Sequence, residues 1–199
     1  MPSVNAVKPK DVAFQRSLDV QFEAFRRNRF IAMPIARAVM WSLIGLVGAF
    51  SSTFYEVWAL YVGTGMIFFV GQGVARFTGE DLLGDAGESR FFDQQFLLSV
   101  GMALLVFAIA IPFAQVDITS LPLSLGILSG LMWVPFSGLI QHWVGVFHGA
   151  TRTALILVVW YLFPEDGFVA VPVVIVAVYL VSIVVLERRA RRFGAEGSA

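Results

Sequence analysis

The chain has 199 residues, 58% of them apolar and only 14% charged, and its mean hydropathy is +0.79. Soluble domains contain about 45–50% apolar and about 25% charged residues, so this composition is typical of an integral membrane protein and argues against a soluble catalytic domain. Fourteen Lys and Arg balance fourteen Asp and Glu, which argues against nucleic-acid binding, and the absence of cysteine excludes disulfides, thiolate metal sites and cysteine nucleophiles.

Residues 1–29 are predicted to form a cytoplasmic tail that contains an amphipathic helix over Asp11–Asn28. Apolar side chains recur there at helical spacing, while the charged side chains lie mostly off that stripe. The stripe consists of Phe14, Leu18, Phe22 and Phe25. Two interpretations stay open: the helix lies on the inner leaflet of the membrane, or it packs on the cytoplasmic ends of the helices that follow.

Six apolar stretches follow the tail, each close to the length of about 20 residues that a helix needs to cross a membrane. They are Phe30–Phe50, Phe54–Val74, Phe96–Ala114, Leu121–Ile140, Trp143–Phe163 and Phe168–Leu186. A spanning chain must pair its own backbone polar groups, and these runs lack the alternation of barrel strands. We therefore predict an all-α polytopic transmembrane bundle of six spans over residues 30–187, preceded by the amphipathic interfacial helix. The first span lacks a cleavage pattern and is expected to serve as its own insertion signal.

The connectors between these spans differ in charge from one side of the predicted bundle to the other. Those on one side contain no Lys or Arg, only Asp117, Glu165 and Asp166 as charged residues. Those on the other side, with the two ends of the chain, contain Lys8, Lys10, Arg16, Arg26, Arg27, Arg29, Arg76, Arg90, Arg188, Arg189, Arg191 and Arg192. Short loops rich in Lys and Arg stay cytoplasmic, so we expect both termini in the cytoplasm, with residues 188–199 as a basic tail.

The fourth span contains two features that affect helix packing. Gly126 and Gly130 form a GxxxG pattern, which lets helices approach closely, either within the chain or between subunits. Pro135 lies well inside the span and removes the hydrogen bond to the carbonyl of Leu131, so it is expected to kink this helix.

Arg152 is a candidate binding residue because the charge asymmetry does not explain it. If its span starts near Trp143, the side chain lies on the order of 13 Å deep. A guanidinium at that depth costs about 2.5–3.5 kcal/mol on insertion scales, and intramembrane ionisable residues indicate functional sites. Alternatively, the span starts near Gly149 and Arg152 is an interface anchor, although the span would then be short.

Several polar residues are expected to gather with this arginine toward the cytoplasmic half of the bundle. His148 precedes it by four residues, on the same helix face. The predicted ligand-binding set is Arg152, His148, His142, Arg37, Gln72 and Gln141. No span carries a clear acidic partner at this depth, which favours an external anion such as a lipid head group or an anionic metabolite. We expect no metal and no cofactor, because two histidines without a facing carboxylate indicate a metal site only weakly.

The chain resembles a known group of proteins over Gly63–Glu187. The resemblance is found in segments within Gly63–Glu187, which include VGQGVARFTGE, MALLVFAIAIPF and, at Leu131–Trp143, LMWVPFSGLIQHW. They are similar to an uncharacterised bacterial family of small multi-pass membrane proteins, a domain of unknown function. The resemblance implies a protein of the bacterial inner membrane and assigns no catalytic residue.

Three functions remain open from the sequence. The leading hypothesis is the binding or transport of a small anionic or amphiphilic ligand from a cationic cavity on the cytoplasmic side. The alternative is an accessory subunit that binds another membrane protein or a second copy of the chain. A lipid-modifying enzyme is the least favoured, because no nucleophile–base pair is visible.

Overall fold

The computed structural model describes residues 18–80 except 21 and 24, the pairs 94–95, 97–98 and 101–102, and residues 105–196. Within these residues every regular element is a helix and no strand occurs, which confirms the all-α class. Half of the predicted amphipathic helix, Asp11–Asn28, and most of the connector Arg76–Gln95 lie outside the described residues. The helices are α2 (Ala32–Phe50), α3 (Thr53–Thr78), α5 (Phe107–Val116), α6 (Ser120–Leu128), α7 (Trp133–Leu139), α8 (Val144–Leu162), the 3₁₀ turn η1 (Pro164–Asp166) and α9 (Gly167–Glu196).

Five of the predicted spans appear as segments long and apolar enough to cross a membrane. These segments are Ala32–Phe50, Thr53–Thr78, Ser120–Leu139, Val144–Leu162 and Pro164–Phe193. The third predicted span, Phe96–Ala114, is represented by the shorter apolar helix α5, because part of its first half is not described. The six-span count is therefore roughly consistent with the structure, which contains five such segments and the shorter helix α5. Helix α9 extends to Glu196, ten residues beyond the end predicted for the sixth span.

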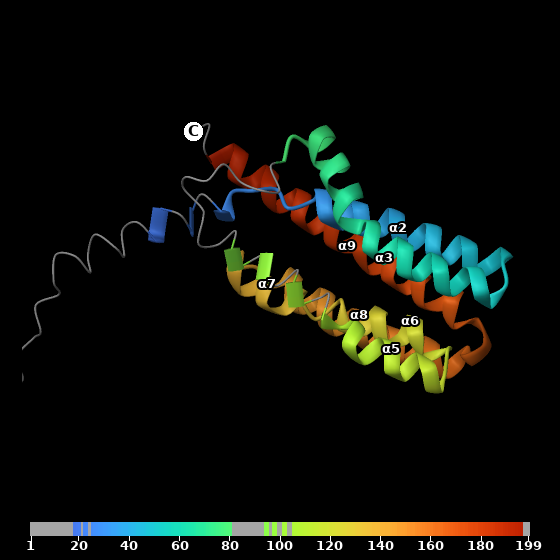
Figure 1. The fold of residues 1–199 in the computed structure, drawn as a ribbon. Coiled ribbons are helices and arrows are strands. Elements are labelled where there is room, and N and C mark those ends of the chain that lie inside the picture. The colour runs from blue at the N-terminus through green and yellow to red at the C-terminus, as the bar shows by residue number, and fades with distance from the viewer. Residues whose placement is uncertain are drawn as a thin grey trace, which may run out of the picture.

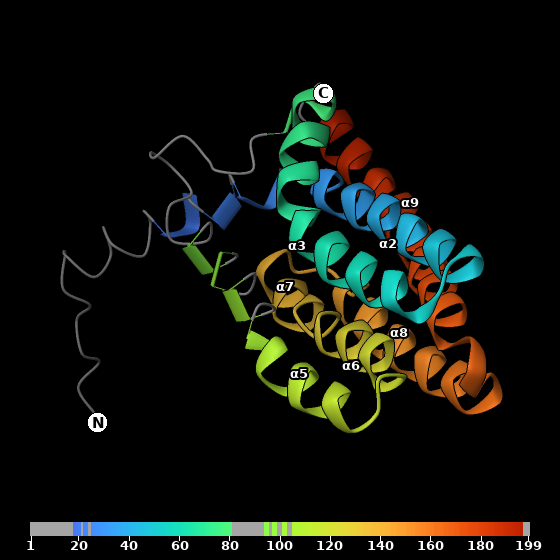
Figure 2. The same cartoon turned by 45° about the vertical axis from the view of Figure 1, so that its right-hand side comes forward.

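The helices pack in two groups that α9 joins (Figures 1 and 2). Helix α2 packs against α3 and α9, while α8 packs against α7 and α9, and α6 packs against α5, α8 and α9. The core lies where these groups meet, and most of its largest fully buried side chains come from α2, α3, α6, α8 and α9. They include Trp41, Ile44, Leu60, Leu121, Leu125, Ile156, Ile175 and Tyr179.

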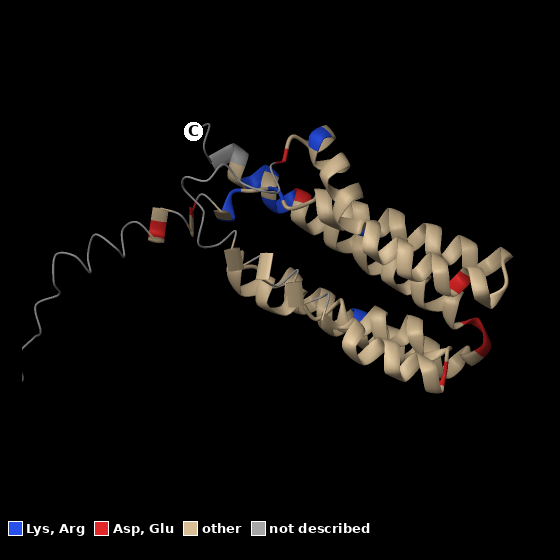
Figure 3. Ribbon diagram, viewed as in Figure 1, with Lys and Arg blue, Asp and Glu red and all other residues tan. Residues whose placement is uncertain are grey.

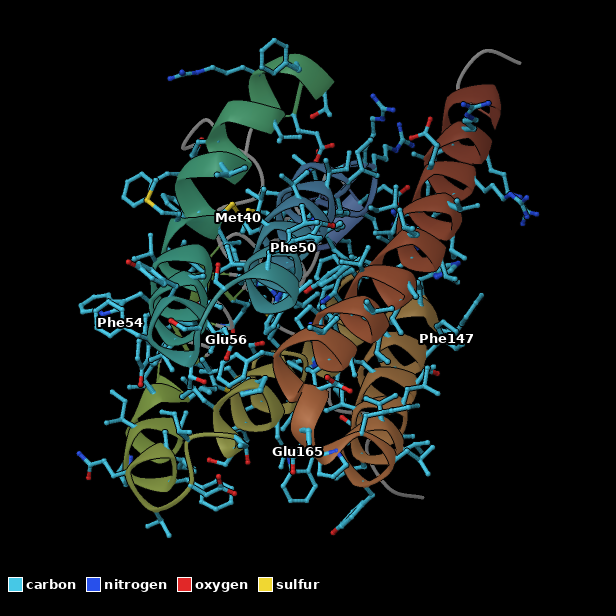
Figure 4. The ribbon with its side chains drawn as sticks, turned by 90° about the vertical axis from the view of Figure 1, so that its right-hand side faces the viewer. Met40, Phe50, Phe54, Glu56, Phe147 and Glu165 are labelled. Atoms are coloured by element: carbon cyan, nitrogen blue, oxygen red, sulfur yellow. The ribbon has the colours of Figure 1, made fainter. Side chains whose placement is uncertain are left out.

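Large apolar side chains also cover the outside of the bundle. In Figure 4, Phe54 on α3 and Phe147 on α8 project away from the helices on opposite sides. Other exposed side chains come from α2, α3, α5, α8 and α9, among them Phe50, Trp58, Phe69, Ile109, Tyr161 and Leu180. Soluble monomers rarely expose contiguous apolar surface on this scale, so this surface is suited to contact with lipid. The protein is therefore a membrane protein.

Charged residues separate along the bundle (Figure 3). Arginines gather where α2 begins and where α3 and α9 end, and we call this the basic end. Acidic residues lie near the opposite end, which faces the viewer in Figure 4, where Glu56 and Glu165 are labelled. Asp166 is next to Glu165 in η1, and Asp117 follows the last residue of α5. This separation is the one that cytoplasmic termini would require. The membrane orientation itself stays a prediction.

The fourth span is interrupted, where the sequence predicted only a kink. Helix α6 ends at Leu128 and α7 begins at Trp133, with turns between them. The amide of Val134 donates to the carbonyl of Leu131 at 3.0 Å. That carbonyl needs this nearer donor, because Pro135 has no N–H to reach it in an α-helix. The interruption lies beside the buried arginines described below, because Arg37 contacts Met132 and Arg152 donates to Ser129.

Candidate functional site

Arg152 lies in the interior of the bundle. Because α8 begins at Val144, Arg152 is its ninth residue and lies about 12 Å from the start of the helix. Only 1% of its surface is exposed, which does not fit an interface anchor. Its Nη1 donates to the hydroxyl of Tyr179 at 3.0 Å and its Nη2 to Oγ of Ser129 at 3.0 Å. The guanidinium also lies over the ring of Trp41, at 5.7 Å from the centroid.

Arg37 approaches the same tyrosine from another helix. It is the sixth residue of α2 and only 8% exposed. Its Nη1 donates to the Tyr179 hydroxyl at 3.2 Å and its Nη2 lies 2.8 Å from Sδ of Met132. A thioether is a weak acceptor, so one of the two terminal nitrogens of Arg37 is poorly satisfied. The two arginines therefore share one neutral acceptor, the hydroxyl of Tyr179.

His148 lies beside the arginine pair. Its ring stacks on Trp133 at a centroid distance of 4.0 Å, and its Nδ1 lies 2.8 Å from Oγ of Ser182. The Ser182 hydroxyl donates to the carbonyl of Val178 at 2.9 Å, so the histidine Nδ1–H is left as the donor to Ser182. His148 Nε2 then carries a lone pair, and it is buried without a hydrogen-bond partner.

The two arginines lack an acidic partner in the part of the chain that the structure describes. The ion pairs found there join other arginines of the basic end to Glu23 or Glu187. The Nε atoms of Arg37 and Arg152 are buried and unpartnered, like His148 Nε2. A buried charge without a partner is unfavourable, so this cluster is an electrostatically incomplete site.

The two glycines of the fourth span pack against residues of the same chain. A Cβ at Gly130 would meet Arg152 Cδ at 2.9 Å and Nε at 3.0 Å, while one at Gly126 would meet Ile156 and Val171. Gly130 thus gives the Arg152 side chain the room that it occupies. The interruption of the helix at this glycine also places Ser129 within hydrogen-bond distance of the guanidinium.

A cavity of about 350 Å³ lies at the basic end, and Arg37 is among its lining residues. Its volume is within the range of small-molecule sites. Aromatic and apolar side chains form much of its wall, with charged side chains among them. The charged lining residues are Arg27, Arg29, Arg37 and Glu80. Three positive charges against one negative charge favour an anion.

Glu80 stabilises this end of the bundle. Its carboxylate accepts hydrogen bonds from the amides of Ile31 and Ala32 at 3.1–3.3 Å, at the start of α2. Carboxylates at this position compensate the positive end of a helix dipole.

Phe25 is buried beside this segment, with its ring 4.8 Å from that of Phe30. This residue of the predicted amphipathic helix therefore packs on the bundle.

A second cavity of about 330 Å³ lies between α2, α3, α5 and α6. Its wall is largely apolar, and Arg37 is its one charged lining residue. Met33 and Arg37 line both cavities, so the two spaces adjoin at these side chains.

Three of the predicted site residues lie away from the buried cluster. His142 is half-buried near Arg189 and Arg192, which together with its burial lower its pKa below the ordinary value. Gln141 is exposed and accepts a hydrogen bond from Arg26 at 3.3 Å. Gln72 lines neither cavity. The structure thus brings together Arg37, His148 and Arg152 from the predicted set. Among the described residues, no group of three His, Asp or Glu side chains could hold a metal.

The role of Arg189 was not predicted from the sequence, where this residue was only one of the basic residues that indicate the membrane orientation. Arg189 is buried and donates to the carbonyls of Arg26, Asn28 and Ile140, fixing α9 to the amino-terminal segment and to the end of α7. It also missed Tyr179 and Ser182. These are the only polar side chains of an otherwise apolar span and lie three residues apart, on one helix face. That spacing is the signal that could have identified them.

Comparisons with known proteins place the chain in a family. No curated protein and no solved structure matches it. The match is to a family of unknown function, DUF7010, and it covers residues 22–189, which contain both arginines, both cavities and every span except the end of the last one. It agrees with the resemblance noted from the sequence and extends it toward the amino terminus. The chain therefore belongs to the DUF7010 family of unknown function.

Proposed function

We propose that this membrane protein binds a small anionic group, a carboxylate or a phosphate, in the cavity at the basic end, with Arg37 as its principal contact. The observation that carries the proposal is the buried pair Arg37 and Arg152. They share one tyrosine hydroxyl, have no acidic partner among the described residues, and Arg37 lines the cavity.

The energetics favour an external anion. Arg152, in the middle of its span, costs about 2.5–3.5 kcal/mol on insertion scales, and Arg37 lies closer to the start of its helix. The Nη1 atoms of the two arginines lie 3.2 and 3.0 Å from one oxygen, so they are at most about 6 Å apart. At that separation two positive charges repel each other by about 3 kcal/mol at an effective dielectric constant of about 20. Hydrogen bonds to charged groups contribute about 1.5–3 kcal/mol each, so one bound anion with two such bonds would offset much of this cost.

Binding is favoured over transport through the whole bundle. The two cavities are lined from the basic end as far as the middle of α2 and α3. None of their lining residues is among the acidic residues of the opposite end. The ligand is therefore expected to enter either from the lipid or from the basic end. On the predicted orientation, the basic end faces the cytoplasm.

The test compares two arginine variants in the full-length protein. Arg37→Gln removes the buried charge, while Arg76→Gln removes an exposed charge at the end of α3 and serves as the control. Native mass spectrometry of protein released from native membranes would identify bound anions, and titration with inorganic phosphate and with laurate would measure affinity. We expect Arg37→Gln to weaken binding about tenfold or more, equivalent to about 1.4 kcal/mol, and Arg76→Gln to leave it unchanged.

Equal retention of anions by the wild type and Arg37→Gln would overturn the proposal. A membrane protein that copurifies with the wild type and with both variants, in the absence of any bound anion, would favour the accessory-subunit alternative instead.

A further inference from the structure

The two cavities differ in chemistry although they adjoin. The basic-end cavity has four charged lining residues, whereas the second has only Arg37. The second cavity contains two hydroxyls, both already donating to backbone carbonyls: Thr64 to Leu60 at 2.6 Å and Ser129 to Leu125 at 2.5 Å. Apart from Arg37, it therefore offers its occupant contacts that are almost entirely apolar.

The second cavity is placed to receive a hydrocarbon chain. Thr64, Gly65 and Phe69 come from the middle of α3, a helix of 26 residues, and therefore lie at the depth of the acyl layer if the helix crosses a membrane. Phe69 is 64% exposed, so the wall of the cavity is also part of the outer surface of the bundle. A chain could reach this cavity from the lipid without passing through the core.

We infer that the ligand is an anionic amphiphile with one acyl chain, of the fatty-acid or lysophosphatidate class. Its carboxylate or phosphate lies at Arg37 in the basic-end cavity, and its chain enters the second cavity past Met33. The inference rests on the proposed function, which assigns the anionic group, and adds the acyl chain of the ligand. It follows from the position of Arg37, the one cation that borders both the polar and the apolar space.

A substitution at a glycine can fill the second cavity without disturbing the arginines. Gly65 lines this cavity, and a Cβ there would meet nothing within 4 Å. A leucine at this position can therefore project into the space where the chain would lie. Gly73 provides a matched control, because it also lies on α3 with open space around its Cβ but lines neither cavity. Both substitutions replace a helical glycine by a better helix former.

The experiment uses full-length protein in nanodiscs and a fatty acid that carries a diazirine in the middle of its chain. Irradiation followed by peptide mapping should place the label on α3 or α6 residues that line the second cavity. Gly65→Leu is expected to reduce labelling and lysophosphatidate affinity about tenfold, while Gly73→Leu leaves both unchanged. The corresponding diazirine alcohol, which has no charge, should label these residues about tenfold less than the acid.

The results separate this inference from the proposed function. If Arg37→Gln abolishes binding of phosphate and fatty acid but Gly65→Leu alters neither labelling nor affinity, anion binding stands and the acyl-chain inference is wrong. If phosphate binds as tightly as lysophosphatidate in the wild type, the ligand is a free anion and the inference is likewise overturned. If Arg37→Gln retains full binding of every probe, both proposals fail.

Discussion

Arg37 on α2 and Arg152 on α8 donate to the same atom, the hydroxyl oxygen of Tyr179 on α9, at 3.2 and 3.0 Å. Helix α2 thus meets the last two α-helices, α8 and α9, at one phenol. The arrangement brings two positive charges close together where the described chain supplies no negative one. Charge repulsion would separate the arginines if Tyr179 and the surrounding packing did not hold them, so the pair is maintained by the fold.

Tyr179→Phe is expected to destabilise the protein by about 1–3 kcal/mol. The ring keeps its shape, but both guanidinium groups lose an acceptor while they stay buried, which leaves unsatisfied charged donors. The free energy of unfolding can be measured by titration with sodium dodecyl sulfate in mixed micelles. Tyr161→Phe is the control, because Tyr161 is 74% exposed and its change should lie within about 0.5 kcal/mol. Equal stability of both variants would show that the hydroxyl of Tyr179 does not hold the arginines.

Arg152→Met is expected to stabilise the ligand-free protein, by on the order of 1–3 kcal/mol. The substitution removes a buried charge and its repulsion with Arg37, and apolar residues often replace buried ionic groups without loss of stability. Stability gained at a site by loss of its charged group is typical of residues retained for function. The same unfolding measurement applies to protein stripped of lipid, with the exposed Arg188→Met as control. A clear loss of stability in Arg152→Met would indicate a structural role for the arginine instead.

Gly130→Ala should displace the Arg152 side chain. The added Cβ would lie 2.9 Å from Arg152 Cδ, so the long side chain must shift away from Ser129. Such overpacking typically costs about 1–3 kcal/mol, and anion affinity should fall with it. Gly138→Ala on α7 meets nothing within 4 Å and should gain up to about 1 kcal/mol from helix propensity. If the two variants unfold alike and bind alike, the contact between Gly130 and Arg152 has no energetic importance.

The sequence could predict the class of fold and most of its spans, because these depend on residue type and length alone. Apolar runs near twenty residues identified five of the spans that the structure contains, and the charge pattern agrees with the two ends of the bundle. The interruption at Ser129–Met132 was only partly predictable. Pro135 indicated a lost hydrogen bond. The position of the break, however, depends on packing against the neighbouring helices, and the sequence of one span does not describe that packing.

The candidate site was predictable only where a residue is unusual for its surroundings. A charged residue inside an apolar stretch is a strong signal by itself, so Arg37 and Arg152 could be predicted as site residues from the sequence. Tyr179 is a weaker signal, because a tyrosine carries no charge and only its spacing from Ser182 distinguishes it within the span. His142 was assigned to the site by its place in the sequence, yet the turn before α8 directs it toward Arg189 and Arg192. Proximity to a site along the chain does not give the direction of a side chain.

His142 is expected to make stability depend on pH. Its pKa is lowered in the folded protein by burial and by the neighbouring charges of Arg189 and Arg192. Below its unfolded value of about 6.5, the unfolded chain therefore binds more protons than the folded one, and stability present above that pH is lost as the pH falls. Unfolding measured at pH 7.5 and pH 5.5 should show a smaller loss for His142→Gln than for the wild type. Arg192→Gln should raise the pKa of His142 and also reduce the loss. An identical pH dependence in all three proteins would mean that the histidine is not under the influence of these arginines.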